Sequence, residues 1–219
     1  MFTISRSSLL KYAFAVMLGG LAFALTANAK TTCGPSPRGQ VCVSQVDFNQ
    51  FAAKAAKLQE QSQWCWAASI SMLFSYYGHP VSQERIVQAV YGRVVNLPSG
   101  PGWNIASQIN RNWQDDEGTA FRSYLTAAYD FDAGVNSLNN AWLVNELDQD
   151  RPFIIGTNGH AVVVTAIEFV PTPMGPNVTS VGVFDPWPGR GARGLTAAEM
   201  TAMHVGGQLR FIATVTVGE

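Results

Sequence analysis

The sequence predicts an α+β protein, with helices in the first half of the chain and an antiparallel sheet in the second. Apolar residues recur at intervals of three and four between residues 65 and 77, which indicates a helix with one buried face. β-branched runs separated by turn-forming residues dominate residues 152–217, as is typical of antiparallel strands. Strands and helices do not alternate, so a parallel βαβ architecture is not expected.

The first 29 residues have the pattern of a secretory signal peptide. Arg6 and Lys11 precede an apolar run over residues 12–25, and residues 27–29, Ala-Asn-Ala, offer a small-x-small cleavage site. The run is too short and too weakly flanked to suit a membrane span. We therefore expect a mature protein that begins at Lys30, is exported to the periplasm or the external medium, and has no stable membrane insertion.

Residues 30–219 are enough for one domain with a hydrophobic core. Charged residues make up 13% of the chain, and the formal net charge is −1. No lysine- or arginine-rich face is present, which disfavours nucleic acid and anionic membranes as partners. The two arginines of residues 188–194, PGRGARG, fit a flexible surface loop. No Cys/His pair has metal-ligand spacing, so we expect neither a metal nor another cofactor, and we expect a monomer.

The three cysteines of an exported protein allow one disulfide and leave one thiol. Cys33 and Cys42 flank the turn-forming residues 34–41, so we expect them to be bridged. Closing such a short loop contributes roughly 2–3 kcal/mol. Cys65 is then the free thiol. An unpaired thiol is a liability in an oxidising compartment, and chemistry is one reason to keep it.

Residues 30–58 are expected to form an irregular N-terminal arm with a short helix from Phe48 to Leu58, and residues 59–219 the main domain. The strongest predicted helix runs from Cys65 to Tyr77, just before a glycine. The other predicted elements are helices at 82–90, 104–113 and 137–147, strands at 121–129, 152–157, 160–170, 178–185 and 209–217, and a short helix opened by the capping box of residues 196–199.

Of the three histidines, His160 is best placed for chemistry. It opens the most apolar predicted strand directly after the flexible residues 157–159, Thr-Asn-Gly, where a side chain can project from a sheet end into a cleft. His79 lies in a turn before Pro80 and His204 at the end of a short helix, and both positions suit a base less well. A thiol nucleophile needs such a base, and a third group to orient it.

The third group follows from strand pairing. If the strands on either side of Thr172 and Pro173 form a hairpin with its turn centred between these residues, paired residue numbers sum to 345. Asp185 then lies directly opposite His160, with Cβ atoms about 5 Å apart. The carboxylate can accept a hydrogen bond from one ring nitrogen and leave the other facing Cys65.

Three blocks of the sequence, QSQWCWAAS, NGHAVVVTAIE and VFDPWP, occur in this order along the chain. They resemble papain-like cysteine peptidases, in particular the bacterial secreted branch with a Trp-Cys-Trp-Ala-Ala nucleophile motif, which is effector-protease-like or bacteriocin-processing-peptidase-like. The resemblance implies a papain-like fold, with the catalytic helix packed on a C-terminal antiparallel sheet, and a peptide or protein substrate. It assigns Cys65 as the nucleophile, His160 as the base and Asp185 as the orienting residue.

The position of Cys65 supports this assignment independently. A helix N-terminus carries about half a positive charge and free N–H groups, which favour a thiolate, and a neighbouring imidazolium favours it further. The backbone N–H of Cys65 can join a glutamine amide in holding an oxyanion. By resemblance that glutamine, six residues before the cysteine, is Gln59, and Gln61 and Gln63 are also available.

The resulting hypothesis is an exported cysteine peptidase that hydrolyses peptide or isopeptide bonds through a Cys65 acyl-enzyme. The same triad can pass the acyl group to an amine, as transglutaminases do, so acyl transfer is the alternative among enzymes. The alternative from another class is a non-catalytic exported binding module that retains the fold. The intact triad argues against this alternative, because a binding module has no need of a free thiol.

Overall fold

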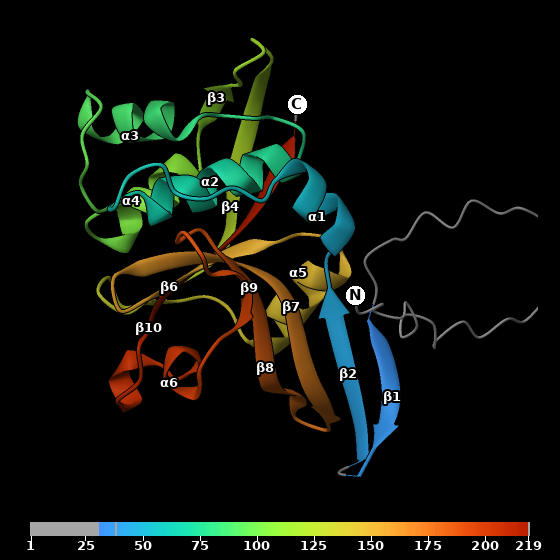
Figure 1. Ribbon diagram of the computed structural model, residues 1–219. Coiled ribbons are helices and arrows are strands. Elements are labelled where there is room, and N and C mark those ends of the chain that lie inside the picture. Colours follow the sequence, from blue (N-terminus) through green and yellow to red (C-terminus); the bar gives the residue numbers. More distant parts are fainter. Residues whose placement is uncertain (1–30, 38, 219) are drawn as a thin grey trace, which may run out of the picture.

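The computed structural model describes residues 31–37 and 39–218 (Figure 1). The signal peptide predicted over residues 1–29 lies outside this part of the chain. Within the described residues, no helix is both long and apolar enough to cross a membrane. In Figure 1 helices α1 to α4 gather above the sheet that contains β2, β6, β7 and β8.

Four helices make up the helical part of the molecule: α1 (Phe48–Lys54), α2 (Cys65–Tyr76), α3 (Gln83–Tyr91) and α4 (Gly102–Gln108). In α2 every residue after Cys65 is buried, so the prediction of a single buried face is wrong. Small alanines and serines on its remaining faces allow neighbouring elements to approach on all sides. As predicted, a glycine stops the helix: Gly78 has a φ of +89°.

The helix predicted over residues 104–113 is shorter in the structure. It ends at Gln108, and Trp113 belongs to strand β3 (Asn112–Gln114). The Trp113 indole N–H donates to the Gln108 carbonyl oxygen at 2.7 Å, and its ring packs edge-on against Phe74 of α2. These tertiary contacts bury Trp113 as part of a strand, so they outweigh the helical periodicity of residues 104–113.

The sheet confirms the predicted α+β class, because all its named strands pair antiparallel. The strand order is β1-β2-β7-β6-β10-β4-β3, with β8 and β9 extending from β7 and with β5 beside β4. The remaining strands are β1 (Thr32–Ser36), β2 (Gly39–Gln45), β4 (Ala120–Asp130), β5 (Val135–Asn136), β6 (Phe153–Thr157), β7 (His160–Thr172), β8 (Gly175–Asp185), β9 (Gly191–Gly194) and β10 (Leu209–Gly218).

The core sits where α2 packs across β7 and β6. Ile70 of α2 and Val162 of β7 are among its fully buried side chains. Each such side chain contributes about 1.5–3 kcal/mol to stability. Because Cys65 is the first residue of α2 and His160 the first residue of β7, this packing also sets the position of one relative to the other.

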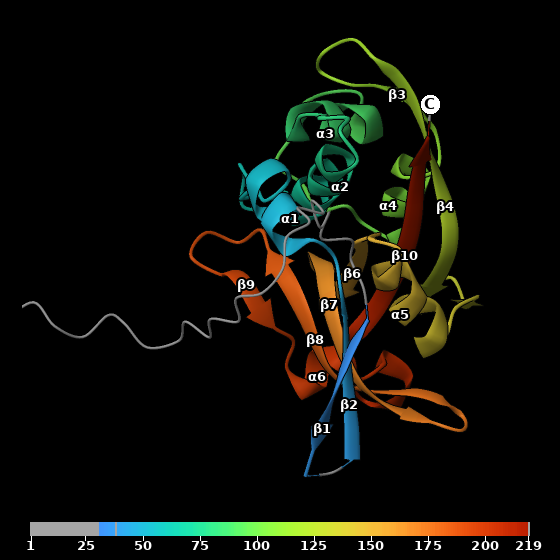
Figure 2. The same ribbon diagram turned by 90° about the vertical axis from the view of Figure 1, so that its right-hand side faces the viewer.

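Two helices and a 3-10 turn complete the fold: α5 (Asn140–Asp148), α6 (Ala197–Met200) and η1 (Met203–Val205). Helix α5 packs against β2, β7 and β8 (Figure 2). It begins three residues later than predicted, since the Asn139 side chain caps it by accepting the Trp142 N–H at 2.9 Å. The capping box predicted at the start of α6 is present between Thr196 and Glu199.

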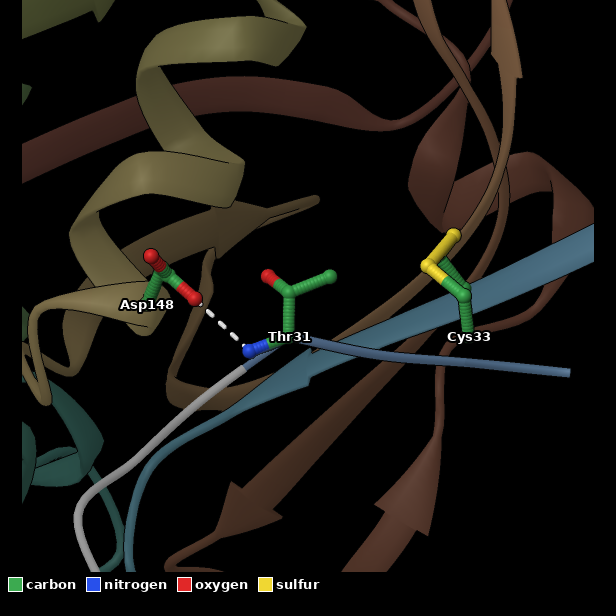
Figure 3. Close-up of a disulfide and its surroundings, with 4 residues drawn as sticks. Thr31, Cys33 and Asp148 are labelled. Atoms are coloured by element: carbon green, nitrogen blue, oxygen red, sulfur yellow. Dashed lines mark hydrogen bonds between the residues drawn. A yellow bond between two sulfur atoms is a disulfide. The ribbon is translucent and has the colours of Figure 1, made fainter.

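The prediction of an irregular arm before α1 is wrong, because β1 and β2 form a hairpin and β2 pairs with β7. The predicted disulfide is confirmed: Cys33 and Cys42 face each other across the hairpin and are bonded (Figure 3). Beside the bridge, the Thr31 N–H donates to Asp148 of α5 at 2.6 Å. The segment read as irregular is therefore part of the sheet.

This bridge leads to a prediction about thiol content. Mass spectrometry of the non-reduced mature protein after alkylation should find one alkylated cysteine, Cys65, because the other two sulfur atoms are bonded to each other. The reduced and denatured protein, as a control, should carry three labels. A disulfide that joins Cys65 to Cys33 or Cys42 would contradict the pairing.

Candidate active site

The N-terminus of α2 is held by the two tryptophans on either side of Cys65. Both rings are buried, and their indole N–H groups donate to the following loop, Trp64 to the Val95 oxygen at 2.8 Å and Trp66 to the Leu97 oxygen at 3.2 Å. Cys65 itself is half-buried and carries a free thiol. The tryptophans therefore fasten the loop over residues 93–101 beside the thiol.

His160 is placed by a tight hairpin turn, not by the flexible stretch expected from the sequence. Thr157 and His160 pair across β6 and β7, which leaves Asn158 and Gly159 as a two-residue loop. Both loop residues have positive φ, 46° and 81°, as a type I′ turn requires. The backbone that carries the imidazole is consequently fixed by the sheet.

The predicted hairpin register between β7 and β8 is wrong by two residues. Thr172 faces Gly175 and Val163 faces Phe184, so paired numbers sum to 347 near both ends, not to 345. The turn centres one residue later than expected. Continuing the register, Asp185 lies diagonally from His160 across the hairpin, a spacing of about 7–8 Å that two side chains can bridge.

Two bulges interrupt this hairpin. Thr179 is an extra residue in β8 and shifts the pairing by one, and Thr165 is an extra residue in β7 and shifts it back. The two shifts cancel before the strands reach the site. Asp185 and His160 are therefore on the same face of the sheet, as the prediction required, although not directly opposite.

The structure brings His160 and Asp185 together. The His160 Nε2–H donates to Asp185 Oδ1 at 2.7 Å, and this leaves Nδ1 as the ring nitrogen available to Cys65. The Trp187 N–H donates to the same oxygen at 2.9 Å. The Trp187 ring meets the imidazole edge-on, with centroids 6.4 Å apart. Asp185 is fully buried, so these donors replace the water that a carboxylate would otherwise bind.

The second oxygen of Asp185 is held by two arginines that the sequence analysis assigned to a flexible surface loop. That assignment holds for Arg190, which lies in an exposed turn, but it is wrong for Arg193, because residues 191–194 form β9 beside β8. Arg193 Nε donates to Asp185 Oδ2 at 2.8 Å and Arg190 Nη1 at 3.3 Å. Arg193 is held in turn by a two-pronged ion pair with Glu199 of the α6 capping box, at 2.8 and 3.0 Å.

A signal for these arginines exists in the sequence, although it is weak. Arg193 lies eight residues after Asp185, and a glycine-rich link of this length suffices for the chain to reverse and pair. A buried carboxylate needs cationic donors, so a nearby arginine is the natural candidate. The signal is weak because glycine and proline around these arginines favour a loop equally well.

Electrostatics favour an ionised pair at the site. Burial lowers the pKa of His160, but the hydrogen bonds and charges of Asp185 and Cys65 outweigh it and raise the pKa to about 9. Burial raises the pKa of Asp185, but the donors His160, the Trp187 amide and Arg193 hold it well below its usual range. His160 is therefore cationic at neutral pH and forms an ion pair with Asp185.

Cys65 and His160 line one cleft of about 230 Å³ between the helical part and the sheet. Its other lining residues are Gln63, Trp66, Pro98, Ser99, Gly100, Gly102, Ile105, Asp130, Asp132, Gly156, Gly159, Ala161, Arg210 and Phe211. Cys65 and His160 therefore open into the same cleft.

The three candidate oxyanion glutamines occupy different environments. Gln59 is buried, its backbone N–H donates to the Pro186 oxygen at 2.8 Å, and its Nε2 donates to the Gln61 oxygen at 2.8 Å. Gln61 and Gln63 are exposed, and Gln63 lines the cleft. The amide of Gln59 carries a second hydrogen beyond the one bonded to Gln61.

The other two histidines lie outside the cleft lining. His79 Nδ1 is 3.1 Å from Asp115 Oδ2, and its ring stacks on Phe121 with centroids 4.4 Å apart. His204 Nδ1 lies 3.5 Å from the Tyr129 hydroxyl. The His79–Asp115 pair resembles a catalytic dyad in composition, but no thiol or hydroxyl nucleophile bonds to this histidine in the described part of the chain.

A cysteine at the start of a helix, packed on an antiparallel sheet that carries a histidine and an aspartate, defines the papain-like class of cysteine peptidases. Residues 48–202 match the family described as papain-like cysteine protease AvrRpt2 (Peptidase_C70), and the chain belongs to this family. The protein is therefore a cysteine peptidase with a papain-like α+β fold, as predicted.

One solved structure similar to the chain is the crystal structure of a double glycine motif protease from an AMS/PCAT transporter in complex with the leader peptide. It is 18% identical in sequence, with a TM-score of 0.40, and the match covers 75% of this chain and 92% of that one. Among curated proteins no sequence matches the chain significantly.

The support of Asp185 by Arg193 can be tested through stability. Arg193→Gln removes a charge-assisted bond to a buried carboxylate and should lower the free energy of unfolding at pH 7 by about 1.5–3 kcal/mol. Arg85→Gln, which breaks the exposed pair with Asp116, is the matched control and should cost at most about 1 kcal/mol. Urea unfolding measures both.

The pH dependence of this loss has a definite sign. A carboxylate with a lowered pKa stabilises the fold above its unfolded pKa, and this contribution is lost as the pH falls. The difference between wild type and Arg193→Gln should therefore narrow below about pH 4. Equal losses for Arg193→Gln and Arg85→Gln at pH 7 would contradict the role assigned to Arg193.

Proposed function

We propose that this cysteine peptidase is exported and cleaves peptide bonds through an acyl-enzyme on Cys65, with His160 as the base and Asp185 as the orienting residue. The observation that carries the proposal is the 2.7 Å hydrogen bond from His160 Nε2 to Asp185, beside the cleft that Cys65 lines. It commits one ring nitrogen to the carboxylate and leaves the other for the thiol.

The proposed reaction begins with attack of the Cys65 thiolate on the carbonyl carbon of the scissile amide, while His160 holds a proton on Nδ1. As the tetrahedral intermediate collapses, the C–N bond breaks, and this proton passes to the leaving amine. A thioester remains on Cys65. His160 then accepts a proton from water, whose oxygen attacks the thioester, and the carboxylic acid leaves as the thiolate re-forms.

The oxyanion of the tetrahedral intermediate needs at least two donors. The backbone N–H of Cys65 is one, because the first N–H groups of a helix have no partner within it. We propose Gln59 as the other. Its backbone bond to Pro186 ties it to the residue after Asp185, and its amide has one hydrogen free to turn toward the intermediate.

Export is proposed from the signal-peptide pattern of residues 1–29. The disulfide between Cys33 and Cys42 supports it, since disulfides form and persist in oxidising compartments. The substrate class, a peptide or protein, is proposed from membership of a peptidase family.

The triad can be tested with a peptide library under mild reductant, with cleavage products followed by mass spectrometry. Cys65→Ala should abolish cleavage, and His160→Ala should reduce the rate by roughly 10²- to 10⁴-fold, the usual contribution of a general acid–base. Asp185→Asn should keep measurable activity, because its amide oxygen can still accept the His160 N–H. Equal rates for wild type and His160→Ala would show that the base is misassigned.

The same assay separates hydrolysis from acyl transfer when a primary amine is added. Hydrolysis releases the free acid, whereas acyl transfer attaches the amine to the new C-terminus. We expect the acid as the main product. A dominant amide product would identify a transferase and would leave the triad assignment intact.

Activation of the thiol can be tested by alkylation with iodoacetamide at pH 6. At this pH less than about one per cent of free cysteine is thiolate. His160 is protonated there, so Cys65 in the folded protein should react much faster than free cysteine. His160→Ala should erase most of this advantage, and the denatured wild type should react like free cysteine. A native rate no faster than that of free cysteine would indicate a structural thiol.

A further inference from the structure

Asp130 is a buried carboxylate in the same cleft as Cys65 and His160. It is the last residue of β4 and is 5% exposed. Its Oδ1 accepts the backbone N–H groups of Asp132 at 3.0 Å and Ala133 at 3.2 Å, so this oxygen shapes the turn after β4. The role of Oδ1 is therefore structural.

The second oxygen of Asp130 has no such role. No donor to Oδ2 is present among residues 31–37 and 39–218. This oxygen points at Gly102, where a Cβ would lie 2.6 Å from it and 2.5 Å from the Phe211 ring. Any other residue at position 102 would cover the oxygen, so the glycine keeps it accessible. Because Oδ2 keeps some exposure to solvent, a donor from a ligand can replace water at this oxygen.

The charge of Asp130 is offset only in part by Arg210, which attracts it from beyond ion-pair distance. Arg210 is bound by Asp132 through two hydrogen bonds of 2.6 Å each, and within the described residues Asp130 forms no ion pair. In the thiolate–imidazolium form that the proposed function requires, Cys65 and His160 together add no net charge. Two carboxylates and one guanidinium remain among the lining residues, so the cleft carries one net negative charge.

We propose that Asp130 binds a cationic nitrogen of the peptide substrate close to the bond that is cleaved. The source is either a lysine or arginine side chain or a free α-amino group. With roughly 30 Å³ per water, the cleft holds about eight waters, which is enough room for one extended lysine or arginine side chain. This inference rests on the proposed function and adds a substrate preference to it.

The test uses pairs of peptides that differ at one position. Each pair carries lysine or the uncharged norleucine at one of the three positions on either side of the scissile bond, and each peptide is made with a free and an acetylated N-terminus. The ratio of kcat/KM within a pair is measured. Wild type should prefer the cationic member by about 10- to 100-fold at one position, the usual range for a charge-assisted hydrogen bond.

Two isosteric variants assign that preference. Asp130→Asn keeps an oxygen for the N–H groups of Asp132 and Ala133 but places an NH₂ group where Oδ2 was, and its ratio should fall to near one. Asp116→Asn removes the same charge from an exposed site outside the cleft lining and should keep the wild-type ratio. Because each ratio compares two substrates of one variant, a partial loss of folded protein cancels.

The outcomes separate this inference from the proposed function. Cleavage by wild type without any preference, or an unchanged ratio in Asp130→Asn, overturns the cation site and leaves the peptidase assignment standing. If wild type cleaves no more than Cys65→Ala, the proposed function fails. The cation site is then judged from Cys65 modification by aminoethyl and by methyl methanethiosulfonate. The cation site is upheld if Cys65 favours the cationic reagent more strongly than free cysteine does and if Asp130→Asn removes this excess. If Cys65 shows no such excess, the cation site is overturned.

Discussion

The negative charge of a carboxylate that is buried away from water has to be balanced by hydrogen-bond donors and cations of the protein. Asp185, at the centre of the site, is such a carboxylate. Its four donors come from β7, from the chain just after β8, and from β9. An uncompensated carboxylate would cost far more than any one of these bonds contributes. All three segments therefore have to be in place for Asp185 to be buried, and its bond to His160 sets the orientation of the imidazole ring.

The hairpin of β7 and β8 carries this arrangement only because its two bulges compensate. A shift of one residue turns every later side chain to the opposite face of a sheet. With Thr179 as the sole bulge, Asp185 would point away from His160. With Thr165 as well, the face is restored. A bulge next to a site usually changes the direction of the side chains beyond it. Here the two shifts cancel, so Asp185 stays on the face of the sheet that carries His160.

Local patterns in the sequence were sufficient for the fold class, for helix α2 and for the pairing of Cys33 with Cys42. They also placed His160 at the start of a strand, because the turn-forming residues Asn158 and Gly159 come directly before it. The hairpin register was wrong because it depends on how tightly residues 172–175 turn. The prediction of the His160–Asp185 pair survived since the error was an even number of residues. Arg193 was missed because its role comes from a buried charge eight residues away, which composition does not show.

The dependence of Asp185 on β9 and α6 has a consequence for how the protein matures. Chains are made from the N-terminus, so Cys65 and its helix emerge early, while Arg193 and Glu199 are among the last parts of the fold to become available. Until they arrive, Asp185 lacks the guanidinium that bonds its Oδ2, and the hydrogen-bond network that orients His160 is incomplete. The proposed triad can therefore be completed only after the chain has been made through Glu199.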